Sequence, residues 1–396
     1  MLNLKKDFPI FSNNPGWIYL DTAATALKPF CLTERLKKFY DMEYSTVNRS
    51  VYKKAVAATG YFHETREKLA QLLNALSQEI IFTRGTTESI NLLAHSLESF
   101  LSFGDAVLIS EAEHHSNIVP WQLLRERKGV ELKVFKVLDN GEWDLESFKS
   151  KLTSNVKIVS VQHVSNVLGT VFPIAEVAKL TKANDSLLIV DGAQAPFHVP
   201  INLKELDVDF YVCSMHKLYG PTGLGMLYGK QHLLEKMSPF HGGGDMIEKV
   251  TFEKTTYQKS PLKFEAGTPN IADVIAFSSV LDYLLEIGFS EIFEHEANLQ
   301  SVLYNELKTI EGLKIIGNSN SKIGINSFVI EGIHPLDLAM YLDSKNIALR
   351  SGHMCAQPLL NRYNLTHLNR VSLGLYNDEE DVERLITSIK KARSIF

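Results

Sequence analysis

Residues 187–217 read LLIVDGAQAPFHVPINLKELDVDFYVCSMHK and join two apolar runs to residues that can perform chemistry. The runs Leu187–Val190 and Phe210–Cys213 predict strands, and Asn202–Leu206 between them predicts a short helix. Asp191 directly follows the first run, and Lys217 ends the stretch. A carboxylate at the end of an apolar strand needs a cationic partner. The stretch therefore predicts one unit of a parallel sheet with polar groups at its carboxyl end.

The same alternation of strands and helices extends over most of the chain. Glu88–Phe100 and Ile174–Ala183 carry apolar residues at helical spacing. Further strands are predicted at Ile80–Thr83, Ala106–Ile109, Leu132–Val137, Lys157–Val161 and Met226–Tyr228. Strands that alternate with helices are typical of an α/β fold with a largely parallel sheet.

The pattern changes after about Leu285, which indicates a second lobe. The predicted elements there are helices at Ile292–Ile310 and Glu379–Ala392 and strands at Leu313–Ile316, Ile325–Ile330, Ile347–Arg350 and Val371–Leu375. We expect a large domain at residues 17–285 and a small α+β domain at residues 286–396, to which an N-terminal arm at residues 1–16 is joined. The cleft between two lobes is the expected ligand site.

The composition is that of an ordinary globular protein and excludes several classes. Of the 396 residues, 45% are hydrophobic and 22% are charged, and the net charge is −5. This balance excludes a disordered chain and argues against a nucleic-acid surface, which is usually basic. No run approaches the roughly 18 apolar residues of a membrane span, and the start MLNLKKDFPIF does not resemble a secretory signal. We expect a cytoplasmic protein without nucleic-acid or membrane partners.

Five polar residues fall where strands of the predicted sheet end: Thr86, His114, Asn166, Asp191 and Lys217. Open α/β sheets bind their ligands at this end of the strands. Thr83–Glu88 also joins a strand to a helix, where free N–H groups and hydroxyls suit a phosphate. His114 and His115 lack a third ligand at useful spacing, so a zinc enzyme is a distant alternative. We prefer an aromatic or proton-transfer role for one of the two histidines.

Cys355 is the cysteine whose surroundings favour reactivity. The segment Leu349–Ala356 places it near an arginine, a histidine and a flexible glycine, and cations favour the thiolate form. Arg370 begins another predicted strand and can bind a carboxylate through a forked pair of hydrogen bonds. Two further cysteines lie in apolar surroundings and are predicted to be inert: Cys31 and Cys213.

Taken together, these segments resemble the class II, Suf-type (SufS-type) cysteine desulfurases, which are pyridoxal-phosphate enzymes of the class-V aminotransferase family with the aspartate aminotransferase fold, fold type I. The resemblance covers nearly the whole chain, at Tyr19–Ala24, Arg84–Glu88, Glu113–Trp121, His163–Thr170, Val190–Gln194, His216–Gly223 and Phe264–Pro269. The segment RSGHMCA at Arg350–Ala356 is the most specific, because class I desulfurases carry their cysteine on a longer loop.

The resemblance implies pyridoxal 5'-phosphate as the cofactor, no metal, and a set of cofactor ligands. Lys217 would hold the cofactor as a Schiff base, Asp191 would keep its pyridine nitrogen protonated, and His114 would stack on its ring. The other implied ligands are Gln194 at the ring hydroxyl, Asn166 beside it, and Thr86, Thr87, Ser214 and His216 at the phosphate. Thr268 would reach the phosphate of the neighbouring subunit, which implies a homodimer.

The resemblance also implies the reaction. The implied catalytic residues are Cys355, Lys217 and His114, and the implied residues for binding L-cysteine are Arg370, Arg350 and Asn166. Cys355 would take the substrate sulfur as a persulfide while L-alanine is released. A SufE- or SufU-like acceptor protein would then carry the sulfur towards the Suf scaffold and iron–sulfur cluster assembly.

Two alternative functions stay open, and the chain departs from the class at two places. The alternatives are a selenocysteine or cysteine-sulfinate lyase on the same cofactor, and a non-catalytic partner protein that keeps the fold. Where the class reads VHRGVHTLS, residues 47–55 read VNRSVYKKA, and substrate preference or acceptor docking can differ there. Met354 stands where the class has a second histidine before the cysteine, which removes a proton donor or cation beside the thiol.

Overall fold

The computed structural model describes residue 2, residues 4–196 and residues 198–396. Its large lobe is built on a seven-stranded sheet in the order β2-β8-β7-β6-β5-β3-β4, in which β8 runs antiparallel to both neighbours. The strands are β2 (Ile80–Thr83), β3 (Ala106–Ser110), β4 (Glu131–Phe135), β5 (Val156–Gln162), β6 (Leu187–Asp191), β7 (Phe210–Ser214) and β8 (Gly225–Gly229). Each strand overlaps a run predicted from the sequence. The expected α/β class with a mostly parallel sheet is therefore confirmed.

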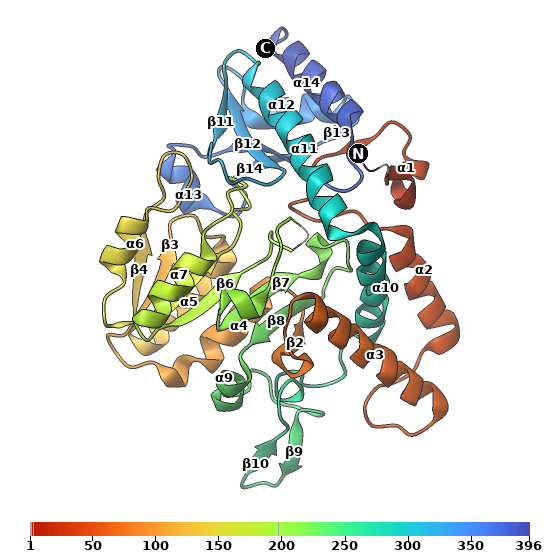
Figure 1. Cartoon of the computed structure of the whole chain (residues 1–396), viewed down its shortest axis with the longest axis vertical. Coiled ribbons are helices and arrows are strands. Elements are labelled where there is room, and N and C mark those ends of the chain that lie inside the picture. The colour runs from red at the N-terminus through yellow and green to blue at the C-terminus, as the bar shows by residue number, and fades with distance from the viewer. Residues whose placement is uncertain (1, 3, 197) are drawn as a thin grey trace.

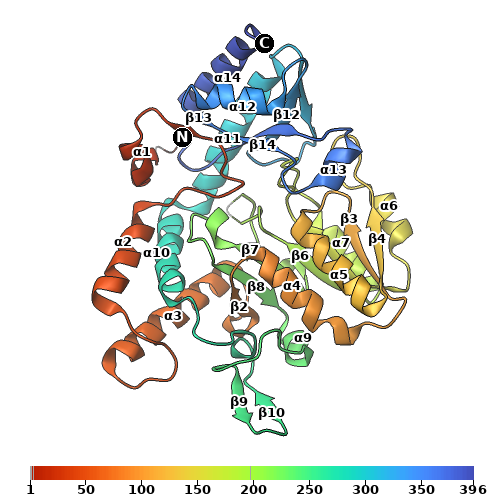
Figure 2. The same ribbon diagram turned by 180° about the vertical axis from the view of Figure 1, so that it is seen from behind.

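Helices cover both faces of this sheet (Figures 1 and 2): α4 (Thr86–Ser96), α5 (Val119–Lys128), α6 (Leu145–Lys151), α7 (Ile174–Ala183), α8 (Leu203–Leu206) and α9 (Gln231–Lys236). Successive residues of a strand point to opposite faces. Ile189 and Val212 pack in the core that includes α4 and α5, whereas Val190 and Tyr211 pack in the core that includes α6 and α7. Burial on both faces explains why these strands read as continuous apolar runs with polar residues at their ends.

The small lobe is a four-stranded antiparallel sheet in the order β11-β12-β15-β14, at the top of Figure 1. Its elements are α11 (Phe289–Lys308), β11 (Leu313–Ile316), β12 (Ile325–Ile330), α12 (Pro335–Asp343), β13 (Ile347–Ala348), β14 (Arg350–Gly352), α13 (Gln357–Arg362), β15 (Leu368–Ser372) and α14 (Glu379–Arg393). The strand predicted at Ile347–Arg350 is divided, because β13 pairs with β1 (Ile18–Tyr19) and β14 pairs with β15. The predicted strand at Val371–Leu375 begins earlier, because Asn369 and Arg370 pair with both neighbouring strands.

Two connections join the lobes. Ile18 and Leu20 are buried in the core of the small lobe, and Lys5 Nζ lies 2.7 Å from Asp381 Oδ1 on α14. At the other connection, Gly288 has a φ of 92° and lets α10 (Ile271–Ile287) turn directly into α11. We keep residues 17–285 and 286–396, with the arm at 1–16, as the proposed division of the chain.

The other elements are α1 (Pro9–Asn13), beside the small lobe in Figure 1, α2 (Phe30–Lys38) and α3 (Lys53–Leu72), which pack against α10, and a hairpin of β9 (Ile247–Val250) and β10 (Thr255–Tyr257) that projects at the bottom of Figure 1. A buried ion pair ties α3 to the sheet. Arg66 Nη1 and Nη2 lie 2.6 and 2.8 Å from the two oxygens of Glu265, and the Phe82 N–H donates to the same carboxylate at 2.7 Å. The two side chains are only 3% and 6% exposed. Within the described residues, no helix is long and apolar enough to cross a membrane.

Replacing Glu265 with alanine should lower the free energy of unfolding by about 3–5 kcal/mol, because Arg66 would keep a buried charge without its partner. Urea unfolding followed by circular dichroism measures this change. The matched control is Glu146→Ala, which removes an exposed ion pair with Lys149. The control should leave the unfolding transition almost unchanged, because exposed ion pairs contribute little. Equal shifts in both variants would contradict the structural role of the buried pair.

Candidate active site

A cavity of about 260 Å³ lies where the carboxyl ends of β5, β6 and β7 face β14 and β15 of the small lobe. Most of the site residues predicted from the sequence line it: Thr86, Thr87, His114, Asn166, Asp191, Gln194, Ser214, His216, Lys217, Arg350, Cys355 and Arg370. Thr268 is the predicted site residue that does not. The structure therefore brings together residues from both lobes, and their individual roles stay predictions.

Lys217 and Asp191 influence each other inside this cavity. Burial lowers the pKa of Lys217 to about 8, although the charge of Asp191 opposes this shift. Burial raises the pKa of Asp191 above its ordinary value, and the Ala193 N–H, 2.9 Å from Oδ1, and the Lys217 charge oppose that shift. A lysine with a lowered pKa is partly a free amine near neutrality. It can therefore act as a nucleophile or a base.

His114 is held as a neutral ring. It caps the 3-10 turn His115–Asn117, and its Nδ1 accepts the Ser116 N–H at 3.1 Å. Burial, followed by the charge of Lys217, lowers the pKa of His114 to about 3. A neutral, flat ring at this place is suited to stack on an aromatic cofactor.

Thr86 and Ser214 form a cluster of hydroxyls at the start of α4 and the end of β7. Ser214 Oγ lies 2.8 Å from both the backbone nitrogen and the Oγ1 of Thr86. Gly225 allows the chain segments to approach this closely, because a Cβ there would lie 2.3 Å from the Cα of Gly85. Hydroxyls beside the free N–H groups of a helix start are suited to hold a phosphate.

Asp21 holds both predicted substrate-binding arginines, although it was not among the site residues predicted from the sequence. Arg370 Nη2 lies 2.8 Å from Asp21 Oδ1, and Arg350 Nε lies 3.1 Å from Oδ2. Arg370 Nη1 also donates to the carbonyl of Asn166 at 3.0 Å. The Arg370 side chain is 3% exposed and that of Arg350 is 47% exposed. The sequence pattern that could have revealed Asp21 is an acid directly after the apolar run Ile18–Leu20, the same pattern that identified Asp191.

Cys355 lies on a tight loop between β14 and α13. Met354 and Cys355 both have a φ of 53°, in the left-handed region, which costs of order 1–3 kcal/mol for a residue with a side chain. The Cys355 N–H donates to His353 Nδ1 at 3.0 Å, and Asn166 Nδ2 donates to the carbonyl of Met354 at 2.8 Å. Cys355 is exposed and also lines the cavity. The thiol is therefore accessible from the site and from solvent.

The other two cysteines differ from Cys355. Cys213 is buried in β7, and burial raises the pKa of its thiol to about 12. Burial also raises the pKa of Cys31. Both thiols stay protonated near neutrality, which agrees with the prediction that they are inert. Within the described residues, no group of three or more His, Cys, Asp or Glu side chains is placed to hold a metal ion.

Glu113 is a second residue near the site that was not among those predicted from the sequence. Its fully buried carboxyl contacts Ser110 Oγ and accepts Asn117 Nδ2 at 2.7 Å and the Gln162 N–H at 3.2 Å. Burial raises the pKa of Glu113 to about 8. These bonds fix the turn that follows His114 to β3 and β5. An isolated Glu in a loop is usually exposed, so no sequence signal could have revealed this role.

Three buried polar atoms on the cavity wall have no hydrogen-bond partner in the described part of the chain: His216 Nδ1, Asn166 Oδ1 and Arg370 Nε. An unsatisfied buried group costs about 1–3 kcal/mol, so each of these atoms indicates a polar ligand. His216 and the Thr86 and Ser214 hydroxyls fit a phosphate, Lys217 fits an aldehyde, and Asp191 fits a protonated ring nitrogen. The residues present therefore fit pyridoxal phosphate and leave the Arg370 guanidinium for a carboxylate.

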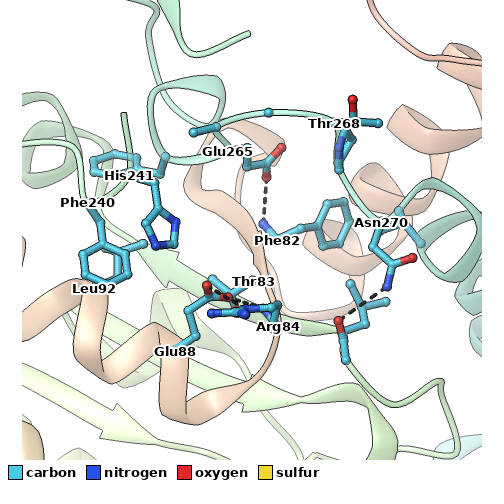
Figure 3. A pocket seen from close by; sticks show the side chains of 17 residues that line it. Phe82, Thr83, Arg84, Glu88, Leu92, Phe240, His241, Glu265, Thr268 and Asn270 are labelled. Carbon is cyan, nitrogen blue, oxygen red and sulfur yellow. Dashed lines mark hydrogen bonds and ion pairs between the residues drawn. The ribbon is translucent and has the colours of Figure 1, made fainter. Parts of the chain in front are cut away.

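Thr268 lies on a second pocket, of about 590 Å³ (Figure 3). This pocket also includes Arg84 and Glu88, which pair at 3.1 Å, and Glu265 of the buried ion pair. Thr268 thus lies on the segment that Glu265 anchors to β2. Its predicted contact with the cofactor of a neighbouring subunit stays a prediction.

Known proteins match this chain over its whole length. Residues 18–385 match the family described as Aminotransferase class-V. A Chlamydia muridarum protein named "Probable cysteine desulfurase" is 44% identical and matches over 98% of both chains. The crystal structure of the Escherichia coli cysteine desulfurase CsdA (S-sulfonic acid) has a TM-score of 0.93 and 36% identity over 100% of both chains. The apo cysteine desulfurase from Thermococcus onnurineus NA1 has a TM-score of 0.95 and 34% identity, over 99% of this chain and 98% of that one.

In cofactor-free protein, Lys217 should react with acetic anhydride with a midpoint near pH 8, because burial lowers the pKa of its amine to about 8. Competitive labelling at a series of pH values, read by mass spectrometry of the Lys217 peptide, measures the midpoint. Asp191→Asn should move the midpoint lower still, because the Asp191 charge raises the pKa of Lys217.

The exposed Lys149 is the control within the same sample, because its ion pair with Glu146 raises the pKa of its amine. A Lys217 midpoint that coincides with that of Lys149 would contradict the electrostatics described for the cavity.

Proposed function

The chain belongs to the class-V aminotransferase family, and from this premise we propose that its cavity converts L-cysteine to L-alanine and keeps the sulfur as a persulfide on Cys355. It is a pyridoxal-phosphate-dependent cysteine desulfurase with fold type I, as expected from its full-length likeness to proteins named for that activity. The observation that carries the assignment of residues is the position of Cys355 on the same cavity as Lys217 and Arg370.

When bound, pyridoxal phosphate supplies an electron sink for the substrate carbons. Asp191 would hold a proton on its ring nitrogen, the neutral His114 ring would pack against it, and Thr86, Ser214 and His216 would hold its phosphate. Lys217 Nζ would bind the group to the chain and, as a free amine, would move the proton of the substrate α-carbon. Its lowered pKa suits this work, because a free amine is available near neutral pH.

Arg370 binds the substrate carboxylate. Asp21 and the Asn166 carbonyl hold its Nη2 and Nη1, so the guanidinium has a fixed orientation. A fixed fork orients the substrate before reaction, and that orientation contributes to the rate. Arg350, on the loop side of Asp21, supplies a second positive charge near the carboxylate.

Cys355 Sγ, as a thiolate, forms a bond to the sulfur of the substrate while the carbon–sulfur bond breaks. The electron pair of that bond stays with the carbon, which takes up a proton and becomes the methyl group of alanine. Cys355 keeps the sulfur as a persulfide, so the reaction consists of two half-reactions. The exposure of Cys355 allows a second protein to collect the sulfur afterwards.

The destination of the sulfur is also part of the proposal. A SufE- or SufU-like acceptor would receive it from Cys355 for iron–sulfur cluster assembly. The proposed compartment is the cytoplasm, where a nucleophilic thiol stays reduced. The proposed assembly is a homodimer in which Thr268 of each subunit reaches the other subunit's cofactor phosphate. Neither a selenocysteine or cysteine-sulfinate lyase nor a non-catalytic partner is favoured by the comparisons.

Cys355→Ser should abolish the release of alanine from L-cysteine, because the variant has no thiolate to take the sulfur. Alanine is measured by chromatography of quenched reactions of the cofactor-loaded protein. Cys31→Ser is the matched control and should keep full activity, since Cys31 lies away from the cavity. Equal alanine production by Cys355→Ser and the parent would exclude Cys355 as the nucleophile. Activity of the variant on selenocysteine alone would favour the lyase alternative.

Thr268→Ala should weaken cofactor binding by about tenfold or more, because a hydrogen bond to a charged phosphate is lost. Equilibrium dialysis measures the affinity, and light scattering should give twice the chain mass of 44.5 kDa for parent and variant. Thr366→Ala, an exposed threonine of the small lobe, is the control and should bind normally. A monomeric parent, or unchanged binding by Thr268→Ala, would refute the proposed shared site.

A further inference from the structure

His115 has no role in the proposed reaction, yet it joins the large lobe to the loop that carries the nucleophile. It begins the turn His115–Asn117 of the large lobe. Its backbone N–H donates to the carbonyl of Cys355 at 2.8 Å. Its ring Nε2 accepts the N–H of Gln357, the first residue of α13, at 3.1 Å.

These two bonds enclose the reactive residue from the side of the large lobe. On the other side, His353 Nδ1 accepts the Cys355 N–H at 3.0 Å. The His115 and His353 rings lie 5.7 Å apart, centroid to centroid, at an angle of 33°. The segment from Cys355 to Gln357 is therefore held between two imidazoles, one from each lobe.

The loop needs such contacts because its backbone is strained. Met354 and Cys355 are consecutive residues in the left-handed region, each with a φ of 53°. Strained residues of this kind persist only when the surrounding structure holds them. His115 and Asn166 are large-lobe residues that bond to this stretch, at the Cys355 carbonyl, the Gln357 N–H and the Met354 carbonyl.

We propose that His115 is a positioning residue that docks the Cys355 loop on the large lobe, so that the thiol faces the sulfur of the bound substrate. The inference rests on the proposed function, because a persulfide forms only if Cys355 reaches the substrate. His115 acts as an acceptor and must keep Nε2 unprotonated. Burial and the neighbouring His353 lower the pKa of His115, which favours that form.

The test compares His115→Ala with His115→Gln in the cofactor-loaded enzyme. Alanine removes the acceptor, whereas the glutamine amide oxygen can accept from the Gln357 N–H and carries no charge. Hydrogen–deuterium exchange of the peptide that spans residues 353–357 reports docking without any need for turnover. Peptides of β11 and β12 in the small-lobe sheet are the internal control.

His115→Ala should speed the exchange of the loop peptide and lower kcat for alanine formation, each by about two- to tenfold. This is the change expected from the loss of one neutral hydrogen bond. The KM for cysteine and the affinity for pyridoxal phosphate should not change. His115→Gln should restore both quantities to within about twofold of the parent. If His115→Ala is too unstable to purify, His115→Leu provides the acceptor-free variant.

Loop exchange and kcat that stay at parental values in His115→Ala would overturn the proposal. A His115→Gln variant as defective as His115→Ala would also overturn it, because the acceptor would then not be the cause. A parent that makes no alanine would refute the proposed function instead, and the exchange measurement would still decide whether His115 docks the loop.

Discussion

Burial of Asp191 and Lys217 at the ends of neighbouring parallel strands is the constraint around which the site is built. β6 and β7 are paired in register, so their carboxyl ends deliver the acid and the amine to the same side of the sheet. Apolar side chains pack on both faces of these strands, and Asp191 at the end of β6 is buried. Desolvation lowers the pKa of Lys217 to about 8, so part of it is a free amine near neutrality. The protonated part, together with burial, lowers the pKa of His114 and keeps that ring neutral. A charged pair on a solvated sheet edge would have neither property.

The large lobe and the positions of the residues that line its cavity could be predicted because strands buried on both faces leave a clear signal. Leu187–Val190 and Phe210–Cys213 are apolar throughout, and the first polar residues after such runs stand at the site. The identity of the cofactor came from resemblance to a family, since a lysine and an acid at strand ends are compatible with other chemistry. β15 was misplaced because the polar residues Asn369 and Arg370 lie inside its paired region.

The residues that prediction missed share one property. Asp21 and His115 act through contacts with segments far away in the chain, Asp21 with Arg370 and His115 with Gln357, and Glu113 contacts Gln162 of another strand besides its own neighbours. A single sequence contains no record of such pairings, and each residue taken alone resembles an ordinary loop or strand-end residue. Only the fold shows that the Asp21 and His115 contacts connect the large lobe to the segments that supply Arg370 and Cys355.

The pairing of β1 with β13 has a consequence for how the chain is made. Ile18 pairs with Ile347, so the first strand leaves the ribosome long before its partner exists. Contacts between such distant segments form late, because closing the long intervening loop costs conformational entropy before the contacts can stabilise the fold. The seven-stranded sheet uses residues 80–229 and can assemble earlier. The small lobe, and with it the arginine and cysteine side of the cavity, is therefore completed last, after the sheet that carries Asp191 and Lys217.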